Sequence, residues 1–146
     1  MEIKGFTGKY RYLSNYYLCE FYYHGACWPS SEHAYQAAKF TNPETRYKIY
    51  MVKTPNAAKK LGGTIKPIRE DWEHIKIRIM YEIVLEKFKQ NKKLKELLLD
   101  TGDAYLEETN TWNDLFWGKD PFGHGENHLG QCLMKVRSEL ARNTRY

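Results

Sequence analysis

Helix-start signals recur through the first half of the chain, and they constrain its fold more than any other feature. Ser30 or Ser31 can accept a hydrogen bond from a free N–H of a first helical turn, which predicts a helix over about residues 31–41. Asn42 with Pro43 and Thr54 with Pro55 repeat the signal, because proline at the first helical position loses no hydrogen bond. Two further short helices are therefore expected there.

The rest of the chain continues the helical pattern. Asp71 precedes the long, largely apolar segment Trp72–Gln90, which reads as a helix packed on more than one side. Gly62 and Gly63 are expected to stop the helix that follows Thr54. The segments "NKKLKELLLDTG" and "LGQCLMKVRSELARN" predict two more helices, the first closed by its glycine.

Strand signals are few and short. "EFYYHGACW" places a glycine-containing turn between two β-prone pieces and predicts a hairpin, and "AYLEET" suggests one short strand. The 146 residues are 42% hydrophobic and 15% aromatic, which is enough to bury one core. We expect an α+β fold, a predominantly helical single domain over residues 1–146 with a few short strands near the N-terminus.

Composition argues against several classes of protein. No run approaches the ~18 apolar residues of a membrane span, and "MEIKGFTGKY" has no apolar core of a signal peptide, so we expect a cytoplasmic protein without a membrane partner. Three cysteines without a CxxC pair argue against a disulfide framework or a zinc site. His124 and His128 are four apart in a loop-like stretch, which is a poor metal signature. We expect no metal and no cofactor.

One polar stripe lies in "SSEHAYQAAKF". At 100° per residue, Glu32, Tyr35, Gln36 and Lys39 span an arc of about 100° on a helix, opposite a cluster of alanines. The stripe is either a solvated face or one wall of a site. Glu32 and Lys39 lie roughly 10 Å apart along the axis, far enough to flank one sugar ring.

The loop from Asn110 to Gln131 is the most unusual stretch. It gathers Trp112, Phe116 and Trp117, whose rings can stack on a base, with several glycines that let the backbone approach a phosphate. Asp114 could stabilise a developing positive charge. The alternative is an aromatic-anchored loop that pins helices together.

These segments together resemble a known family. "GFTGKYRYLSNYY", "WPSSEHAYQAAKF", a tryptophan heading the long helix, "EKFKQNKKLKELLLDTG", "DLFWG" and "GENHLGQCLMKVR" occur in the order typical of the NADAR superfamily, which includes the YbiA-like N-glycosidases. The resemblance runs from about Gly5 to Arg137 and implies a YbiA-like fold.

The resemblance implies a hydrolase of the N-glycosidic bond between a ribose C1′ and a base or amine. One group in the family removes ADP-ribose from modified guanine in nucleic acid, and another cleaves phosphoribosyl intermediates of riboflavin synthesis. The functional positions that it carries over are Glu32, Trp72, Asp114 and Trp117, and Lys39 and Asn127 match as well.

The roles follow from the chemistry of the bond. Glu32 and Asp114 are assigned to charge stabilisation at C1′ and protonation of the departing nitrogen, in an order left open. Lys39 either binds phosphate as a cation or, once desolvated, attacks C1′ and forms a Schiff base. Trp72 and Trp117 would sandwich the base or sugar. The remaining expected substrate contacts are Arg11, Ser14, Asn15, Tyr35, Gln36, Gly118 and Asn127.

The net charge of +5 favours an anionic partner. We expect ADP-ribosylated nucleic acid as the substrate, with an ADP-ribosyltransferase toxin as a candidate counterpart. Two alternatives stay open: a phosphoribosyl-pyrimidine intermediate or another ADP-ribose-like small molecule as substrate, and a non-catalytic module that only binds ADP-ribose.

Overall fold

The computed structural model describes residues 1–144, and the chain divides into two compact units. Unit 1 combines Met1–Ser14 with Asn91–Tyr146, and unit 2 is Asn15–Gln90. Helices outnumber strands, and every strand is short, which confirms the predominantly helical α+β class. The expectation of one domain over residues 1–146 stays a prediction.

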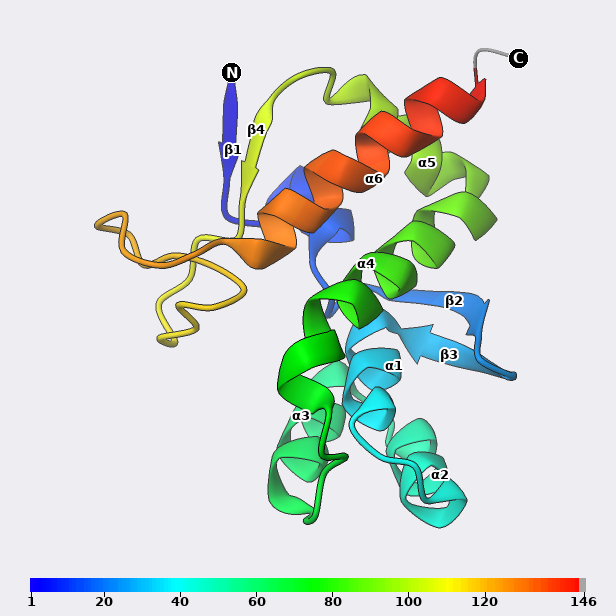
Figure 1. Ribbon diagram of the computed structural model, residues 1–146. Helices are drawn as coiled ribbons and strands as arrows, with labels where there is room; N and C mark the ends of the chain where they lie inside the picture. The colour runs from blue at the N-terminus through cyan, green and yellow to red at the C-terminus, as the bar shows by residue number, and fades with distance from the viewer. Residues whose placement is uncertain (145–146) are drawn as a thin grey trace. The chain divides into compact units, whose positions relative to one another are not determined.

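Unit 2 begins with the predicted hairpin. β2 (Leu18–Tyr23) pairs antiparallel with β3 (Ala26–Ser30) (Figure 1). In the register, Phe21 lies opposite Trp28. His24 and Gly25 turn the chain with φ of 48° and 81°, values that suit the tight connection of a two-residue hairpin.

Four helices complete unit 2: α1 (Ser31–Ala38), α2 (Pro43–Met51), α3 (Pro55–Thr64) and α4 (Trp72–Gln90). The caps are those that the sequence predicts. Ser30 accepts a hydrogen bond from the N–H of His33, and Asn42 accepts one from Glu44. Thr54 accepts its hydrogen bond from Ala57. α1 packs against α2, α3, α4 and β3, so it is the central element of unit 2.

The predicted end of α3 is wrong. The helix continues through Gly62 and Gly63 to Thr64. Gly62 is buried, and a Cβ at this position would overlap the side chain of Gln36 on α1. Glycine is present here because two helices approach closely, not because the chain must turn.

Unit 1 contains a two-stranded parallel sheet. β4 (Tyr105–Glu107), which the sequence predicts, pairs with β1 (Glu2–Lys4), which it does not. A short 3₁₀ helix, η1 (Gly8–Leu13), follows β1. β1 escapes prediction because only Ile3 of its three residues is buried, too little for an alternating pattern.

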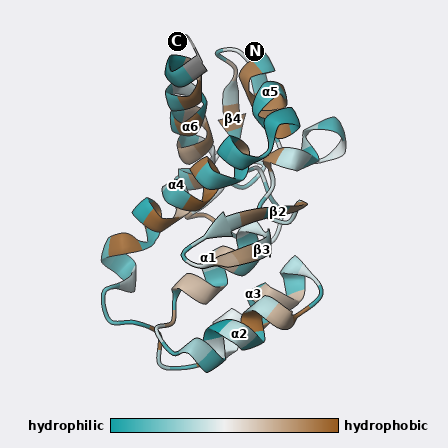
Figure 2. Ribbon diagram, turned by 90° about the vertical axis from the view of Figure 1, so that its right-hand side faces the viewer, coloured by the Kyte–Doolittle hydropathy of each residue, from teal (hydrophilic) through white to brown (hydrophobic). Residues whose placement is uncertain are grey.

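Two helices pack together in unit 1. α5 (Lys92–Asp100) contacts α6 (His128–Thr144), and α6 also contacts β4. Figure 2 shows hydrophobic and hydrophilic residues alternating along both helices, as expected for amphipathic elements. The loop predicted over 110–131 ends at Asn127, since α6 begins at His128. Within residues 1–144, no helix is both long enough and apolar enough to cross a bilayer.

Candidate functional site

The helix that carries the polar stripe is buried on every side. Glu32 is 7% exposed, Tyr35 6% and Gln36 4%, although all three lie opposite the alanines. Only Lys39, the C-cap residue of α1, is partly exposed. The alternative of a stripe in water is therefore wrong.

The first turn of α1 is held by side-chain and backbone hydrogen bonds. Ser30 Oγ lies 2.7 Å from Nδ1 of the fully buried His33, whose Nε2 lies 2.9 Å from the carbonyl oxygen of Val52. Burial lowers the pKa of His33, which keeps the ring neutral and suits a structural role. The N–H of Glu32 donates to the carbonyl of Asn15, which places Asn15 next to the glutamate.

Gln36 links the glutamate to the neighbouring helix. Its Nε2 donates a hydrogen bond of 3.4 Å to Glu32 Oε1, one turn earlier along α1. The rest of the Gln36 side chain fills the space left by Gly62 on α3. Its Oε1 is buried and has no hydrogen-bond partner among the described residues. Packing against α3 thus fixes Gln36, and the hydrogen bond from Gln36 orients the carboxylate.

Lys39, Tyr35 and Trp72 form a contiguous group. The Lys39 Nζ lies 5.9 Å from the centroid of the Tyr35 ring, within range of a cation–π contact. The Tyr35 and Trp72 rings lie 5.1 Å apart, centroid to centroid, at an interplanar angle of 54°. Trp72 comes from the first position of α4 and is 3% exposed. Three of the predicted site residues therefore meet in unit 2.

The surroundings of Lys39 shift the pKa of its amine downward. Burial lowers its pKa, the nearby Glu32 carboxylate opposes that change, and Lys66, Lys76 and Lys59 lower the pKa further. A lysine whose pKa is lowered has a larger fraction of nucleophilic amine near neutral pH. The arrangement has the two properties that a Schiff-base lysine needs, partial burial and surrounding positive charge.

In unit 1, Asp114 shapes its own loop. Its Oδ1 accepts hydrogen bonds from the N–H groups of Phe116 (3.2 Å) and Trp117 (3.0 Å). The Asn110 side chain bonds both the N–H and the carbonyl of Asp114, at 3.1 Å and 3.0 Å. Glu32 and Asp114 belong to different units, and their catalytic pairing stays a prediction.

Asn127 and Gly118 also hold this loop together. Asn127, which has a φ of 53°, accepts from the N–H of Glu108 at 3.0 Å and donates to the carbonyl of Leu106 at 2.9 Å. Gly118 is buried, and a Cβ there would overlap the carbonyl of Glu108. These contacts give both residues a structural role, and substrate contact by either stays a prediction.

The remaining predicted site residues of unit 1 are Trp117, in the loop before α6, and Arg11 and Ser14, at the end of η1. The Trp117 ring meets Phe116 edge to face, with centroids 4.8 Å apart. Arg11 is exposed near the end of η1, and its carbonyl accepts a hydrogen bond from the N–H of Ser14. Their substrate contacts stay predictions.

The comparisons with known proteins decide the family. The NADAR domain model matches residues 4–141, nearly the whole chain. The chain belongs to the NADAR family. The NMR structure of YbiA from Escherichia coli is similar to this NADAR chain, with a TM-score of 0.89 and 36% sequence identity over 99% of this chain and 89% of that one.

Two relatives of this NADAR chain carry functional names. A riboflavin biosynthesis protein of Vibrio vulnificus (strain YJ016) is 42% identical over 136 residues, which are 92% of this chain but 37% of that protein. The chain therefore spans just over a third of that relative's length. N-glycosidase YbiA of Escherichia coli (strain K12) is 42% identical over 118 residues, 80% of this chain and 73% of that protein.

Sequence reasoning missed four residues around the NADAR helix α1. Lys59, Lys66 and Lys76 act on the Lys39 amine, and burial together with the Glu32 charge raises the pKa of Tyr16 to about 12. No spacing signal could have found them, because the three lysines come from α3, the following loop and α4. Among residues 1–144, no three His, Cys, Asp or Glu side chains gather as a metal site.

Proposed function

We propose that this chain is an N-glycosidase that hydrolyses the bond between a ribose C1′ and the nitrogen of a base. The observation that carries the proposal is Lys39, a partly buried lysine whose pKa is lowered by burial and by three neighbouring lysines. The name of the Escherichia coli relative, an N-glycosidase, supports the reaction class.

In the proposed reaction the neutral Lys39 amine attacks C1′. A new C1′–Nζ bond forms while the C1′–base bond breaks, and its electron pair leaves with the base nitrogen, which takes a proton from an acid group. The adduct loses an amine proton, and its C1′–O4′ bond then breaks as O4′ takes up a proton, which opens the sugar ring and leaves a protonated Schiff base between C1′ and Nζ. Water then adds to C1′ of the Schiff base, and the C1′–Nζ bond breaks. This step releases the sugar and regenerates the Lys39 amine.

Glu32 is the group that lowers the barrier. A carboxylate next to C1′ stabilises the positive charge that builds on the sugar as the base departs. The hydrogen bond from Gln36 and the buried position of α1 fix this carboxylate before the substrate arrives. The Trp72 and Tyr35 rings, in contact with each other, offer an aromatic surface for the base or the sugar.

The preferred substrate is an ADP-ribosylated guanine base in nucleic acid, from which ADP-ribose is released. ADP-ribose carries a diphosphate, and Lys59, Lys66 and Lys76 add positive charge around Lys39. The net charge of +5 suits a polyanionic substrate.

A phosphoribosyl-pyrimidine intermediate is the second candidate. The observation in its favour is the name of the Vibrio vulnificus relative, a riboflavin biosynthesis protein whose matching region covers 92% of this chain. This substrate is also anionic and has the same C1′–N bond, so Glu32 and Lys39 would act on it in the same way.

A parallel assay separates the two substrates. The protein is incubated with DNA that carries ADP-ribosyl-guanine and, separately, with the phosphoribosyl-pyrimidine intermediate, and free ADP-ribose is measured beside ribose 5-phosphate. Release of ADP-ribose alone supports the preferred substrate, and release of ribose phosphate alone supports the second candidate. If neither product is released, the proposed reaction class is contradicted.

Borohydride trapping tests the covalent role of Lys39. Reduction during turnover should leave the sugar attached to Lys39, and the Lys39→Arg variant should lose both the adduct and the activity. A protein that turns over substrate without any trapped adduct would show that Lys39 acts only as a cation.

A further inference from the structure

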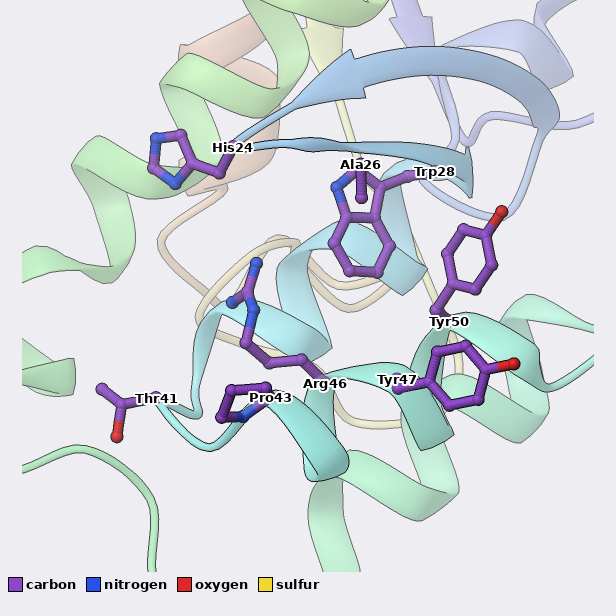
Figure 3. Close-up of a pocket in the computed structure, with 8 residues that line it drawn as sticks. All are labelled: His24, Ala26, Trp28, Thr41, Pro43, Arg46, Tyr47 and Tyr50. Carbon is purple, nitrogen blue, oxygen red and sulfur yellow. The ribbon is translucent and has the colours of Figure 1, made fainter.

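A pocket lies in unit 2, and none of its lining residues belongs to the group around Glu32 and Lys39. It has a volume of about 380 Å³, close to the lower end of small-molecule sites. Figure 3 shows residues from the hairpin on one side and from α2 and the segment before it on the other. The lining residues are His24, Ala26, Trp28, Thr41, Pro43, Arg46, Tyr47 and Tyr50.

Arg46 supplies a cation that no described carboxylate neutralises. Its Nη1 donates to the carbonyls of Ala37 (2.9 Å) and Phe40 (3.4 Å), and within residues 1–144 no Asp or Glu forms a salt bridge with it. Arg69 also acts on Arg46, but its own guanidinium is paired with the carboxylate of Asp71 at 2.6 Å, so Arg46 is the cation of this pocket. A partly buried guanidinium in this setting favours an anion in the pocket, and its planar fork suits phosphate.

Aromatic rings surround the guanidinium. Arg46 Cζ lies 5.6 Å from the centroid of the buried Trp28 ring, which meets Tyr50 edge to face at 5.7 Å (Figure 3). Tyr47 stacks near Tyr50, with centroids 6.3 Å apart and an interplanar angle of 24°. Tyr47 is 61% exposed, so one face of its ring is free to stack on a planar ligand.

We propose that this pocket binds a nucleotide unit, with the phosphate on Arg46 and the base stacked on Tyr47. The combination of one cation with the adjacent exposed ring of Tyr47 matches a molecule that carries an anion and a planar ring, and the volume fits one such unit. His24, whose Nε2 lies 3.9 Å from Glu82 Oε1, is at the opposite end of the lining.

A purely structural explanation of Arg46 makes a different prediction. Its bonds to Ala37 and Phe40 tie the end of α1 to α2, and that role alone needs no ligand and no exposed Tyr47. Tyr47→Ala separates the two explanations, because it removes the stacking surface and leaves the Arg46 bonds intact. Tyr22→Ala is the matched control, since Tyr22 is 69% exposed on β2 and does not line the pocket.

The test is calorimetric titration with guanosine 5′-monophosphate, guanosine and ribose 5-phosphate. The monophosphate should bind with a Kd below about 1 mM. The two fragments, which lack the phosphate or the base, should each bind at least about tenfold more weakly. Tyr47→Ala should weaken binding of the monophosphate by about tenfold, as loss of one stacked base does, and Tyr22→Ala should leave it unchanged.

Arg46→Lys adds a second test of the same site. Lysine keeps the charge but loses the bidentate fork, so binding should again fall. If this variant fails to fold, Tyr47→Ala still decides the question. Absence of binding at 1 mM, or equal affinities of Tyr47→Ala and Tyr22→Ala, overturns the proposal.

The source of the nucleotide unit is distinguished by a short single-stranded oligonucleotide. If the oligonucleotide binds more tightly than the monophosphate, and Tyr47→Ala abolishes this difference, the ligand is an unpaired base in a strand. Equal affinities identify a free nucleotide. The titrations are repeated in Glu32→Gln, which should bind as the parent does, so that the pocket is tested independently of the proposed hydrolysis.

Discussion

The Nζ of Lys39 lies 5.9 Å from the centroid of the Tyr35 ring, one turn earlier on the same buried helix. This position keeps the amine next to an aromatic surface. The nearby Glu32 raises the pKa of the amine, and three nearby lysines lower it. Burial is the largest influence and also lowers the pKa. The reactivity of this one amine therefore reports on the whole group.

The first prediction concerns the titration of Lys39. Its modification by an amine-reactive reagent, mapped by mass spectrometry, should rise with pH around a midpoint below the ~10.4 of an ordinary lysine. Lys66→Met should raise the midpoint because it removes a neighbouring cation, and Glu32→Gln should lower it because it removes the anion. Lys60→Met is the control, since Lys60 is not among the charges that act on Lys39.

The second prediction concerns catalysis by Glu32. Glu32→Gln keeps the size of the side chain but removes the charge that stabilises the sugar cation, so kcat should fall by roughly 10²–10⁴-fold. Substrate affinity, measured by titration, should change little. Glu44→Gln, an exposed glutamate in the first turn of α2, should keep full activity. A Glu32→Gln variant that loses only affinity would instead identify a non-catalytic ADP-ribose-binding module.

The third prediction concerns the contact between α1 and α3. Gly62→Ala should destabilise the protein by about 1–3 kcal/mol, because the new methyl group overlaps the Gln36 side chain. Gly63→Ala is a matched control one residue later on the same helix, where a Cβ meets nothing within 4 Å. It should stabilise the helix by up to about 1 kcal/mol. Urea unfolding measures both, and equal effects would contradict the close packing.

The fourth prediction concerns Lys87, which is 1% exposed on α4. Its Nζ lies 5.1 Å from the Phe88 ring centroid and 5.8 Å from that of Tyr17. Burial lowers its pKa to about 8, a change that the nearby Cys19 opposes. The unfolded chain, with an ordinary lysine pKa near 10.4, thus binds more protons than the folded protein between about pH 8 and 10.

The free energy of unfolding should therefore gain a contribution from Lys87 as the pH rises through that window, on the order of 3 kcal/mol in total. Comparison with Lys87→Met isolates this contribution, because the tyrosines titrate in both proteins. Urea unfolding at pH 7.5 and 9.5 should show the variant stabilised relative to the parent at the lower pH and less so at the higher. A constant difference between the two proteins would exclude titration of a buried amine.

The local features of the fold were predictable from the sequence. Ser30, Asn42 and Thr54 each cap a helix through a bond to an N–H two or three residues ahead, so the signal and the structure occupy the same few residues. The hairpin around His24 and Gly25 is equally local. Helical spacing also grouped Glu32 with Lys39, since residues on one helix keep their relative direction wherever the helix packs.

Features that depend on residues distant in the sequence were decided by the tertiary structure alone. β1 forms only because β4, about a hundred residues later, pairs with it, and no pattern in three residues records that partner. Gly62 looks like a helix stop until Gln36 fills the space beside it. The stripe of α1 looks solvated until α2, α3, α4 and β3 surround it.

The sequence by itself determined which residues could do chemistry: a carboxylate and an amine on one helix, in a chain with the ordered motifs of the NADAR family. Only the fold decided the surroundings that lower the pKa of the amine. Burial and the charges of Lys59, Lys66 and Lys76 set the pKa of Lys39, and those lysines reach it from other elements. A pKa depends on distance and desolvation in three dimensions, which the order of residues does not specify.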